Sequence, residues 1–217
     1  MSSTVGKWEM DELRLIVGSM VILSGATALL VVMPYMLLKD QEPPPGLQPY
    51  TAEQLAGRQV YIANGCIYCH TQQPRDIAQA PDALRGWGRA PVAADYAYDT
   101  PHLLGTMRTG PDLLNIGARQ PSKDWHLGHL YQPRAYTPGS IMPAYPYLFE
   151  VRQGAALPGD TVVALPPAFA RPGEVVVARP EALALVAYLL GLDRTYPALA
   201  PLSVAAPAAA AAKKAGP

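Results

Sequence analysis

The stretch NGCIYCH (residues 64–70) contains both cysteines of this 217-residue chain, Cys66 and Cys69, and places His70 directly after them. A CxxCH pattern of this kind is typical of c-type haem attachment. Two thiols three residues apart on a helical turn can reach the two vinyl groups of one haem, and the histidine that follows can bind the iron. The sequence therefore predicts one covalent haem c, attached through Cys66 and Cys69, with His70 as an axial ligand.

Other interpretations of the two cysteines have less support. A structural zinc site needs two further nitrogen or sulfur ligands, and the chain has no second CxxC. A thioredoxin-like redox pair needs a βαβ unit, and no such pattern of elements surrounds residues 64–70. A membrane-anchored scaffold protein without haem is a further alternative, in which the cysteines form a disulfide or are incidental.

A helix is predicted immediately before the CxxCH stretch. Thr51 is a good N-cap and Gln54 follows three residues later, which together make a capping box. Asn64 and Gly65 then provide a helix stop. Apolar residues at helical spacing form one apolar face, made of Ala52, Leu55, Ala56, Val60 and Ala63.

A second helix is predicted near the far end of the chain, starting at Pro180 and ending at Gly191. Its apolar residues at helical spacing lie on one stripe, made of Leu183, Val186, Ala187 and Leu190. Before it lie two β-prone runs, residues 161–165 and 175–178, which proline and glycine separate. We expect these two runs to pair as a small hairpin.

Residues 15–38 contain no charged side chain. At about 1.5 Å per residue, a helix of this length spans about 36 Å, enough to cross a hydrocarbon core of about 30 Å. The run exceeds the apolar region of a cleaved signal peptide, about 7–15 residues, so we interpret it as an uncleaved signal anchor. Lys7 and Arg14 favour a cytoplasmic N-terminus, although Lys39 follows the span closely.

The composition excludes some classes of function. Hydrophobic residues make up 50% of the chain and charged residues only 16%, against about 25% charged residues in an average soluble domain. With 17 basic and 17 acidic residues the net charge is zero, so binding to nucleic acid by phosphate neutralisation has no support. The 24 prolines predict long loops.

The expected fold class is mostly α, with a single N-terminal transmembrane helix followed by a cytochrome c-like haem domain with long loops. Proline-rich sequence after the span predicts a semi-rigid linker, and the Ala/Pro end of the chain predicts disorder. The expected segments are a cytoplasmic N-terminal segment (1–14), the transmembrane helix (15–38), a Pro-rich linker (39–50), the cytochrome c domain (51–196) and a disordered tail (197–217).

The second axial ligand of the iron is predicted to be Met142. It lies in SIMPAYP (residues 140–146), a turn-rich loop bounded by proline, and such a loop can hold a thioether towards an iron. Core packing is the ordinary role of a methionine. The other candidates beyond the span are Met107, His102, His126 and His129, and we expect His126 and His129 on a polar or interfacial helix face.

Two further residues are candidates for supporting the haem. The carbonyl of Pro111 can accept a hydrogen bond from Nδ1 of His70 and so fix its tautomer, although Gly-Pro-Asp also makes an ordinary turn. Arg108 can meet a haem propionate, because a guanidinium suits carboxylates. Most arginines are simply solvated, and Arg108 has this alternative as well.

The chain resembles the membrane-anchored mono-haem cytochrome c subunit (subunit II) of cbb3-type haem-copper oxidases. The long insert between CxxCH and GPDL, residues 71–107, also resembles that family. The matching stretches are GLQPYTAEQLAGRQVYIANGCIYCHTQ (46–72), AYDTP (97–101), RTGPDLLNIG (108–117), and DWHLGHLYQPR with IMPAYPYL (124–148). They cover most of residues 30–149.

The resemblance implies a cytochrome c fold outside the membrane, with Met142 as the distal ligand, and partnership with a multi-span catalytic subunit carrying haems and copper. The chain departs from the family after CxxCH, where residues 73–76 read QPRD instead of an Arg-Pro-Phe-like stretch. Residues 150–179 and the Ala/Pro tail match nothing in the family pattern, which leaves the particular complex open.

We therefore expect an electron-transfer subunit in the bacterial cytoplasmic membrane, with its haem domain on the periplasmic side. It would act with the catalytic subunit and with other cytochrome c subunits or a soluble cytochrome c donor. The chain is not expected to be an enzyme alone, because no nucleophile–base arrangement or carboxylate pair stands out. The cytochrome c subunit of a nitric oxide reductase is the main alternative.

Overall fold

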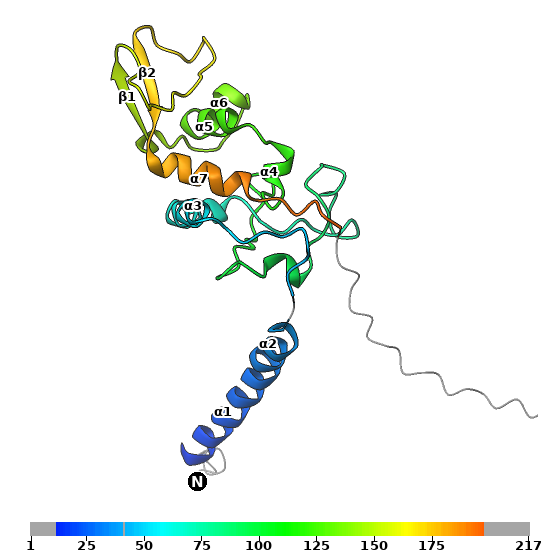
Figure 1. Cartoon of the computed structure of the whole chain (residues 1–217). Coiled ribbons are helices and arrows are strands. Elements are labelled where there is room, and N and C mark those ends of the chain that lie inside the picture. Colours follow the sequence, from blue (N-terminus) through cyan, green and yellow to red (C-terminus); the bar gives the residue numbers. More distant parts are fainter. Residues whose placement is uncertain (1–11, 41, 198–217) are drawn as a thin grey trace, which may run out of the picture. The chain divides into compact units, whose positions relative to one another are not determined.

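The computed structural model describes residues 12–40 and 42–197 (Figure 1). The chain divides after Glu42 into two compact units. The first is an apolar helix, and the second is a mostly helical body with a small sheet. The expectations for most of the N-terminal segment and for nearly all of the Ala/Pro tail lie outside the described residues.

The first unit is one apolar helix that runs from Glu12 to Leu38. It consists of α1 (Glu12–Thr27), a π-helical turn (Ala28–Val32) and α2 (Met33–Leu38). The π-helical turn lies just before Pro34, which has no N–H to donate and whose ring presses on the preceding turn. With 27 residues, it is the one helix of the described residues that is long and apolar enough to cross a membrane.

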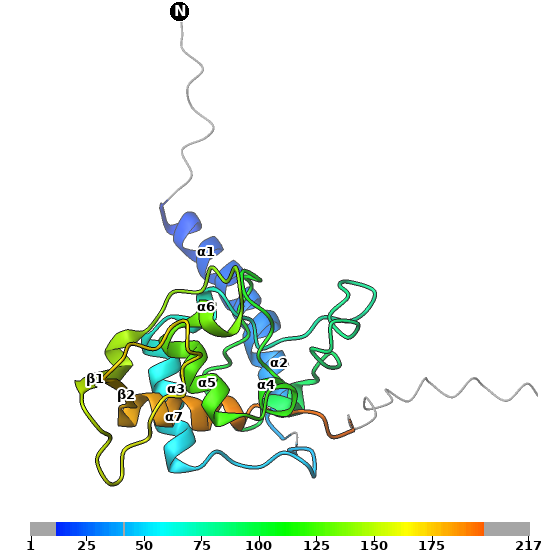
Figure 2. The ribbon, with the colours of Figure 1, turned by 90° about the horizontal axis from the view of Figure 1, so that it is seen from above.

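The second unit is built on two helices from opposite ends of its sequence, α3 (Ala52–Ala63) and α7 (Pro180–Leu190). They lie side by side in both views (Figures 1 and 2). The Thr51 hydroxyl accepts from the amide of Gln54, and the Gln54 side chain accepts from the amide of Thr51, so the predicted capping box is confirmed. The predicted bounds of both helices are confirmed as well.

The two helices approach each other most closely at Gly57. A Cβ on this residue would lie 1.8 Å from the carbonyl oxygen of Ala184, so the approach requires glycine. One turn later the buried rings of Tyr61 and Tyr188 meet edge to face, with centroids 5.6 Å apart. Aromatic pairs in this geometry add about 0.5–1.5 kcal/mol beyond the area that they bury.

The apolar face of α3 is not the face that the rest of the unit covers. Its members are exposed or only half-buried: Ala52, Leu55, Ala56, Val60 and Ala63. The residues that face the core are Gly57, Arg58 and Tyr61. The spacing of apolar residues does not reveal this face. Gly57 is buried because it has no side chain and lets α7 approach, and the Arg58 guanidinium is buried because it lies 3.5 Å from the Asp99 carboxylate.

The sheet has two antiparallel strands, β1 (Phe149–Gln153) and β2 (Glu174–Ala178), with Phe149 opposite Ala178 and Gln153 opposite Glu174. The predicted strand at 175–178 is therefore confirmed, and its predicted pairing with residues 161–165 is confirmed in part, because the full ladder forms with β1 instead. Residues 161–165 add only one isolated bridge, between Val162 and Val177. β1 carries glutamate, arginine and glutamine on a largely exposed strand, so its sequence shows no run of apolar residues.

The insert between residues 71 and 107 is mostly loop, and buried carboxylates hold it in place. Asp95 is fully buried and takes two hydrogen bonds from Arg89, at 2.7 and 2.8 Å. Asp99 lies near both Arg58 and Arg194, which reach it from α3 and from the segment after α7. Breaking a buried ion pair costs about 3–5 kcal/mol, so these contacts fix a segment in which only Ala94, Tyr96 and Leu103 are buried apolar side chains.

The remaining α-helices described in the body are short. They are α4 (Ile116–Arg119), α5 (Lys123–Tyr131) and α6 (Pro133–Tyr136). The hydroxyl of Ser122 caps α5 by accepting from the amide of Trp125 at 3.2 Å. From Pro43 onwards the segment predicted as a linker belongs to the second unit, where Leu47 is buried.

We expect Gly57→Ala to lower the free energy of unfolding by about 1–3 kcal/mol, the usual cost of overpacking a close contact. Helix propensity alone would predict that the same substitution raises the free energy of unfolding by about 1 kcal/mol. The sign of the measured change therefore separates overpacking from helix propensity. Thermal unfolding of the full chain in detergent, monitored by circular dichroism, measures this change in stability. Ala56→Leu on the exposed face of α3 is the control, and a stabilised Gly57→Ala variant would contradict the packing described above.

Candidate functional site

The CxxCH turn begins where α3 ends. Gly65 adopts a left-handed conformation (φ 65°) that reverses the chain, and a single 3₁₀ turn then covers Cys66–Tyr68. The amides of Cys69 and His70 both donate to the carbonyl oxygen of Cys66, at 3.2 and 3.0 Å. The turn thus places two free thiols and one imidazole within five residues.

The imidazole of His70 is held by the Gly110–Pro111 turn. Nδ1 lies 2.7 Å from the carbonyl oxygen of Pro111, and because a carbonyl only accepts, Nδ1 carries the proton. Burial lowers the pKa of His70, which favours the neutral ring, in which Nε2 keeps its lone pair. The ring lies against Gly110, where a Cβ would come within 2.3 Å of His70 Cε1.

A short ladder joins this turn to the CxxCH segment. The Gly110 amide donates to the Cys69 carbonyl and the Leu113 amide donates to the Thr71 carbonyl, both at 2.8 Å. The buried Asp112 carboxylate accepts from the Thr71 hydroxyl at 2.5 Å and from the backbone amide of Gln73 at 2.7 Å. These bonds fix the position of Pro111 relative to His70.

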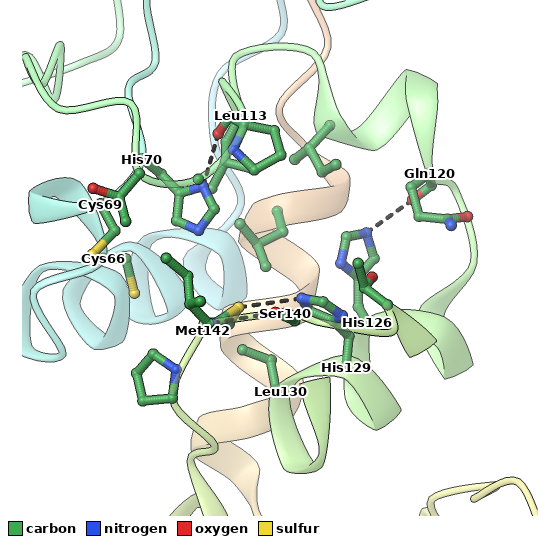
Figure 3. A pocket seen from close by; sticks show the side chains of 18 of the residues that line it. Cys66, Cys69, His70, Leu113, Gln120, His126, His129, Leu130, Ser140 and Met142 are labelled. Carbon is green, nitrogen blue, oxygen red and sulfur yellow. Dashed lines mark hydrogen bonds between the residues drawn. The ribbon is translucent and has the colours of Figure 1, made fainter. Parts of the chain in front are cut away.

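A cavity of about 560 Å³ opens beside this turn (Figure 3). Cys66, Cys69, His70 and Met142 all line it. Much of the remaining wall is apolar and includes Leu113, Ile116, Leu130, Pro143 and Leu189. The volume lies within the range of small-molecule and cofactor sites, about 300–1,000 Å³.

Met142 reaches the cavity from the loop after α6. Its amide donates to the Ser140 hydroxyl at 3.2 Å, and its sulfur lies 3.2 Å from Nε2 of His129 (Figure 3). Since the thioether has no proton, Nε2 of His129 is the donor in this contact. His129 in turn stacks on Trp125, with centroids 4.5 Å apart and planes 9° apart.

The other ligand candidates divide into two groups. Met107 is 54% exposed and His102 packs against Tyr96, and neither lines the cavity. His126 and His129 both line it, so their expected place on a polar or interfacial face is wrong. Burial, and to a smaller extent the repulsion that protonated His126 and His70 would exert, lowers the pKa of His129 to about 4 and leaves the ring neutral near pH 7.

Arg108, a candidate for contact with a propionate, does not line the cavity. Its guanidinium lies 2.5 Å from the fully buried Asp82 carboxylate and donates to the Gln73 carbonyl. It also lies over the Trp87 ring, 5.5 Å from the centroid. Among the described residues, the arginine that lines the cavity is Arg119, which no motif in the sequence marks. Only the tertiary structure distinguishes these two arginines.

The residues in the cavity suit a c-type haem. Two thiols can form thioether bonds, the free Nε2 of a neutral imidazole can bind iron, and a thioether sulfur is a ligand found opposite histidine in cytochromes c. A side chain on Gly110 would occupy the space that the His70 ring needs. The apolar wall suits the face of a porphyrin.

An apolar N-terminal helix followed by a mostly helical body, with a CxxCH histidine and a methionine in one cavity, is typical of membrane-attached c-type cytochromes. The chain belongs to the family described as "Cytochrome C oxidase, mono-heme subunit/FixO", whose model matches residues 6–165. The resemblance to the mono-haem subunit of cbb3-type oxidases is thereby confirmed. The match includes β1, which the resemblance had left out. No curated protein matches the chain.

In protein produced without haem, we expect Cys69 to be alkylated faster than Cys66, by on the order of tenfold or more. Burial raises the pKa of Cys66 to about 11, so little thiolate forms there near pH 8, whereas Cys69 is exposed. Iodoacetamide labelling followed by peptide mass mapping gives the two rates. Unfolding in urea should make them similar, and faster labelling of Cys66 in the folded protein would contradict the described turn.

Proposed function

We propose that this chain is the electron-transfer subunit of a membrane terminal oxidase and carries one haem c bound covalently to Cys66 and Cys69. The observation that carries the proposal is that both thiols, His70 and Met142 line the same cavity. Membership of a family of mono-haem cytochrome c oxidase subunits supports it. The proposal implies a cytochrome c-like domain over residues 51–196.

The residues have separate roles in this proposal. His70 binds iron through Nε2, because its Nδ1 proton is donated to Pro111. Met142 provides a neutral sulfur ligand, and histidine–methionine ligation raises the reduction potential. The apolar wall excludes water from the ligands. When bound, the haem supplies a one-electron redox centre, and the chain by itself needs no catalytic group.

The family match favours an oxidase complex over a nitric oxide reductase. We propose that the electrons pass to a multi-span haem-copper catalytic subunit, and that other cytochrome c subunits or a soluble cytochrome c supply them. The helix Glu12–Leu38 provides a single-pass anchor. Residues 1–14 would then be cytoplasmic, and the haem domain would lie on the periplasmic side, where c-type haem is attached.

Covalent haem is the first test of the proposal. Denaturing electrophoresis stained for haem should give a band near 23.2 kDa, the mass of the chain. The intact mass should exceed that of the bare chain by one haem, and the double variant Cys66→Ala, Cys69→Ala should lose the stain. A wild-type mass equal to that of the bare chain, after expression with the haem-attachment machinery, would refute the assignment.

Met142 is tested by the near-infrared sulfur-to-iron band of the oxidised protein. We expect this band in the wild type and its complete loss in Met142→Ala, where the reduced haem should also bind carbon monoxide. Met142→His should keep six-coordinate iron at a markedly lower potential, because a thioether favours reduced iron more than imidazole does.

Met107→Ala and His129→Ala are the controls for Met142, and both should keep the near-infrared band. The two controls test the alternatives directly, since Met107 lies outside the cavity and His129 lies beside Met142. Loss of the band in Met107→Ala alone would transfer the ligand role to Met107. Absence of the band in the wild type would indicate a histidine ligand.

A further inference from the structure

Two segments that contribute to the lining of the cavity contain no aspartate, glutamate, lysine or arginine. They are residues 59–74, which include both thiols and His70, and residues 135–149, which include Met142. Charged residues make up 16% of the whole chain, so the two segments depart clearly from its composition. Where these segments reach the surface, they present no charged side chain to a partner.

Large apolar side chains are exposed on both segments. Tyr68 is 76% exposed, Ile141 72% and Tyr147 58%. Ile141 also lines the cavity, so it lies at the mouth of the cavity. The Tyr68 ring lies over Gly65, another lining residue, where a Cβ would come within 2.8 Å of that ring.

Tyr147 connects the mouth of the cavity to the end of α3. Its hydroxyl donates to the side-chain oxygen of Asn64, and its ring centroid lies 6.0 Å from that of Tyr145, which lines the cavity. Asn64 directly follows α3, whose last residue, Ala63, is exposed. The exposed apolar surface therefore continues from the mouth of the cavity onto α3.

The exposed side of α3 extends this surface. Ala56 and Ala63 lie two turns apart on one side of the helix, and Leu55 beside Ala56 is 47% exposed. The other side of α3 packs against α7 (Figures 1 and 2). The exposed charged side chain of α3 is Glu53, in its first turn. We call the following residues together the uncharged face: Leu55, Ala56, Ala63, Tyr68, Ile141 and Tyr147.

An exposed apolar face without charge fits a permanently bound partner. Soluble proteins that meet transiently are guided to each other by complementary charges, which raise the rate of association. The uncharged face offers no charges for such guidance. The cores of stable interfaces, by contrast, are depleted of charged residues and enriched in tyrosine.

A membrane anchor also removes the need for guidance by charge. The helix Glu12–Leu38 is long and apolar enough to hold this chain in the same membrane as a multi-span subunit. Two proteins tethered in this way meet at a high effective concentration. The chain belongs to a family of oxidase subunits, so a permanent partner is expected.

We propose that the uncharged face is the docking surface for the multi-span catalytic subunit, and that a soluble donor cytochrome binds elsewhere on the chain. The proposal rests on the proposed function, which supplies the catalytic subunit as the partner. Because the uncharged face includes the mouth of the cavity, docking there would bring the partner close to the cavity. A charged donor would find no complementary charges on this face.

The first test is photo-crosslinking in membranes of a host that makes the complete oxidase. Tyr68 is replaced by the photoreactive benzoylphenylalanine, and the crosslinked products are identified by mass spectrometry. We expect a crosslink from position 68 to the catalytic subunit. The control is the same replacement at Leu157, which is 61% exposed in the segment between β1 and β2 and should give no crosslink to that subunit.

The second test places a charge on the face away from the cavity. In Ala56→Glu we expect the amount of catalytic subunit that copurifies with the chain to fall by about tenfold or more, because an unpaired charge in an interface is costly. Leu157→Glu is the matched control and should leave this amount unchanged. Both variants should keep the haem stain and the near-infrared band, because neither residue lines the cavity.

The outcomes separate this proposal from the proposed function. A wild type without covalent haem, or without a copurifying catalytic subunit, refutes the proposed function. An intact, haem-loaded complex with no crosslink from position 68 to the catalytic subunit refutes only the docking surface, as does a crosslink to a donor cytochrome in its place. Undiminished copurification in Ala56→Glu would also overturn the docking surface, and the crosslink decides alone if that variant does not fold.

Discussion

The hydrogen bond between Nδ1 of His70 and the carbonyl oxygen of Pro111, 2.7 Å long, joins the CxxCH turn to the middle of the chain. It sets the tautomer of the ring and leaves Nε2 free for a ligand. The bond depends on Gly110, where a side chain would displace the ring, and on the Asp112 carboxylate, which ties this turn to Thr71 and Gln73. The geometry of the cavity follows from this arrangement.

The body around the cavity is stabilised in two different ways. The α3–α7 pair is apolar and closely packed, with Gly57 allowing the helices to approach and Tyr61 packed on Tyr188. The insert between residues 71 and 107 depends instead on buried carboxylates. Burial raises the pKa of Asp95, but the hydrogen bonds from Arg89, from the Val92 amide and from the Tyr196 hydroxyl outweigh it and hold that pKa below its usual value. A long loop can thus be ordered without an apolar core of its own.

The apolar face of α3 is exposed, and the face that the rest of the unit covers carries an arginine. Leu55 is 47% exposed, and its apolar neighbours Ala52, Ala56 and Ala63 are exposed too, while a buried arginine occupies the opposite face. Spacing of apolar residues indicates which face of a helix is apolar, but it does not indicate which face the rest of the chain covers. Arg58 is on the covered face because Asp99 and the carbonyl oxygens of Thr100 and Pro101 receive its guanidinium.

The sequence alone determined the features that arise from neighbouring residues: the CxxCH turn, the capping box at Thr51, the apolar helix and the limits of α7. Each depends on contacts within a few positions, so local chemistry is sufficient to predict it. The tertiary structure decided which face of α3 is buried and which strand forms the ladder with β2. It also placed His126 in the lining of the cavity, and it paired Arg108, but not Arg119, with a carboxylate. These outcomes depend on residues far apart in the chain, whose approach is set by packing and by the pairing of buried charges rather than by periodicity.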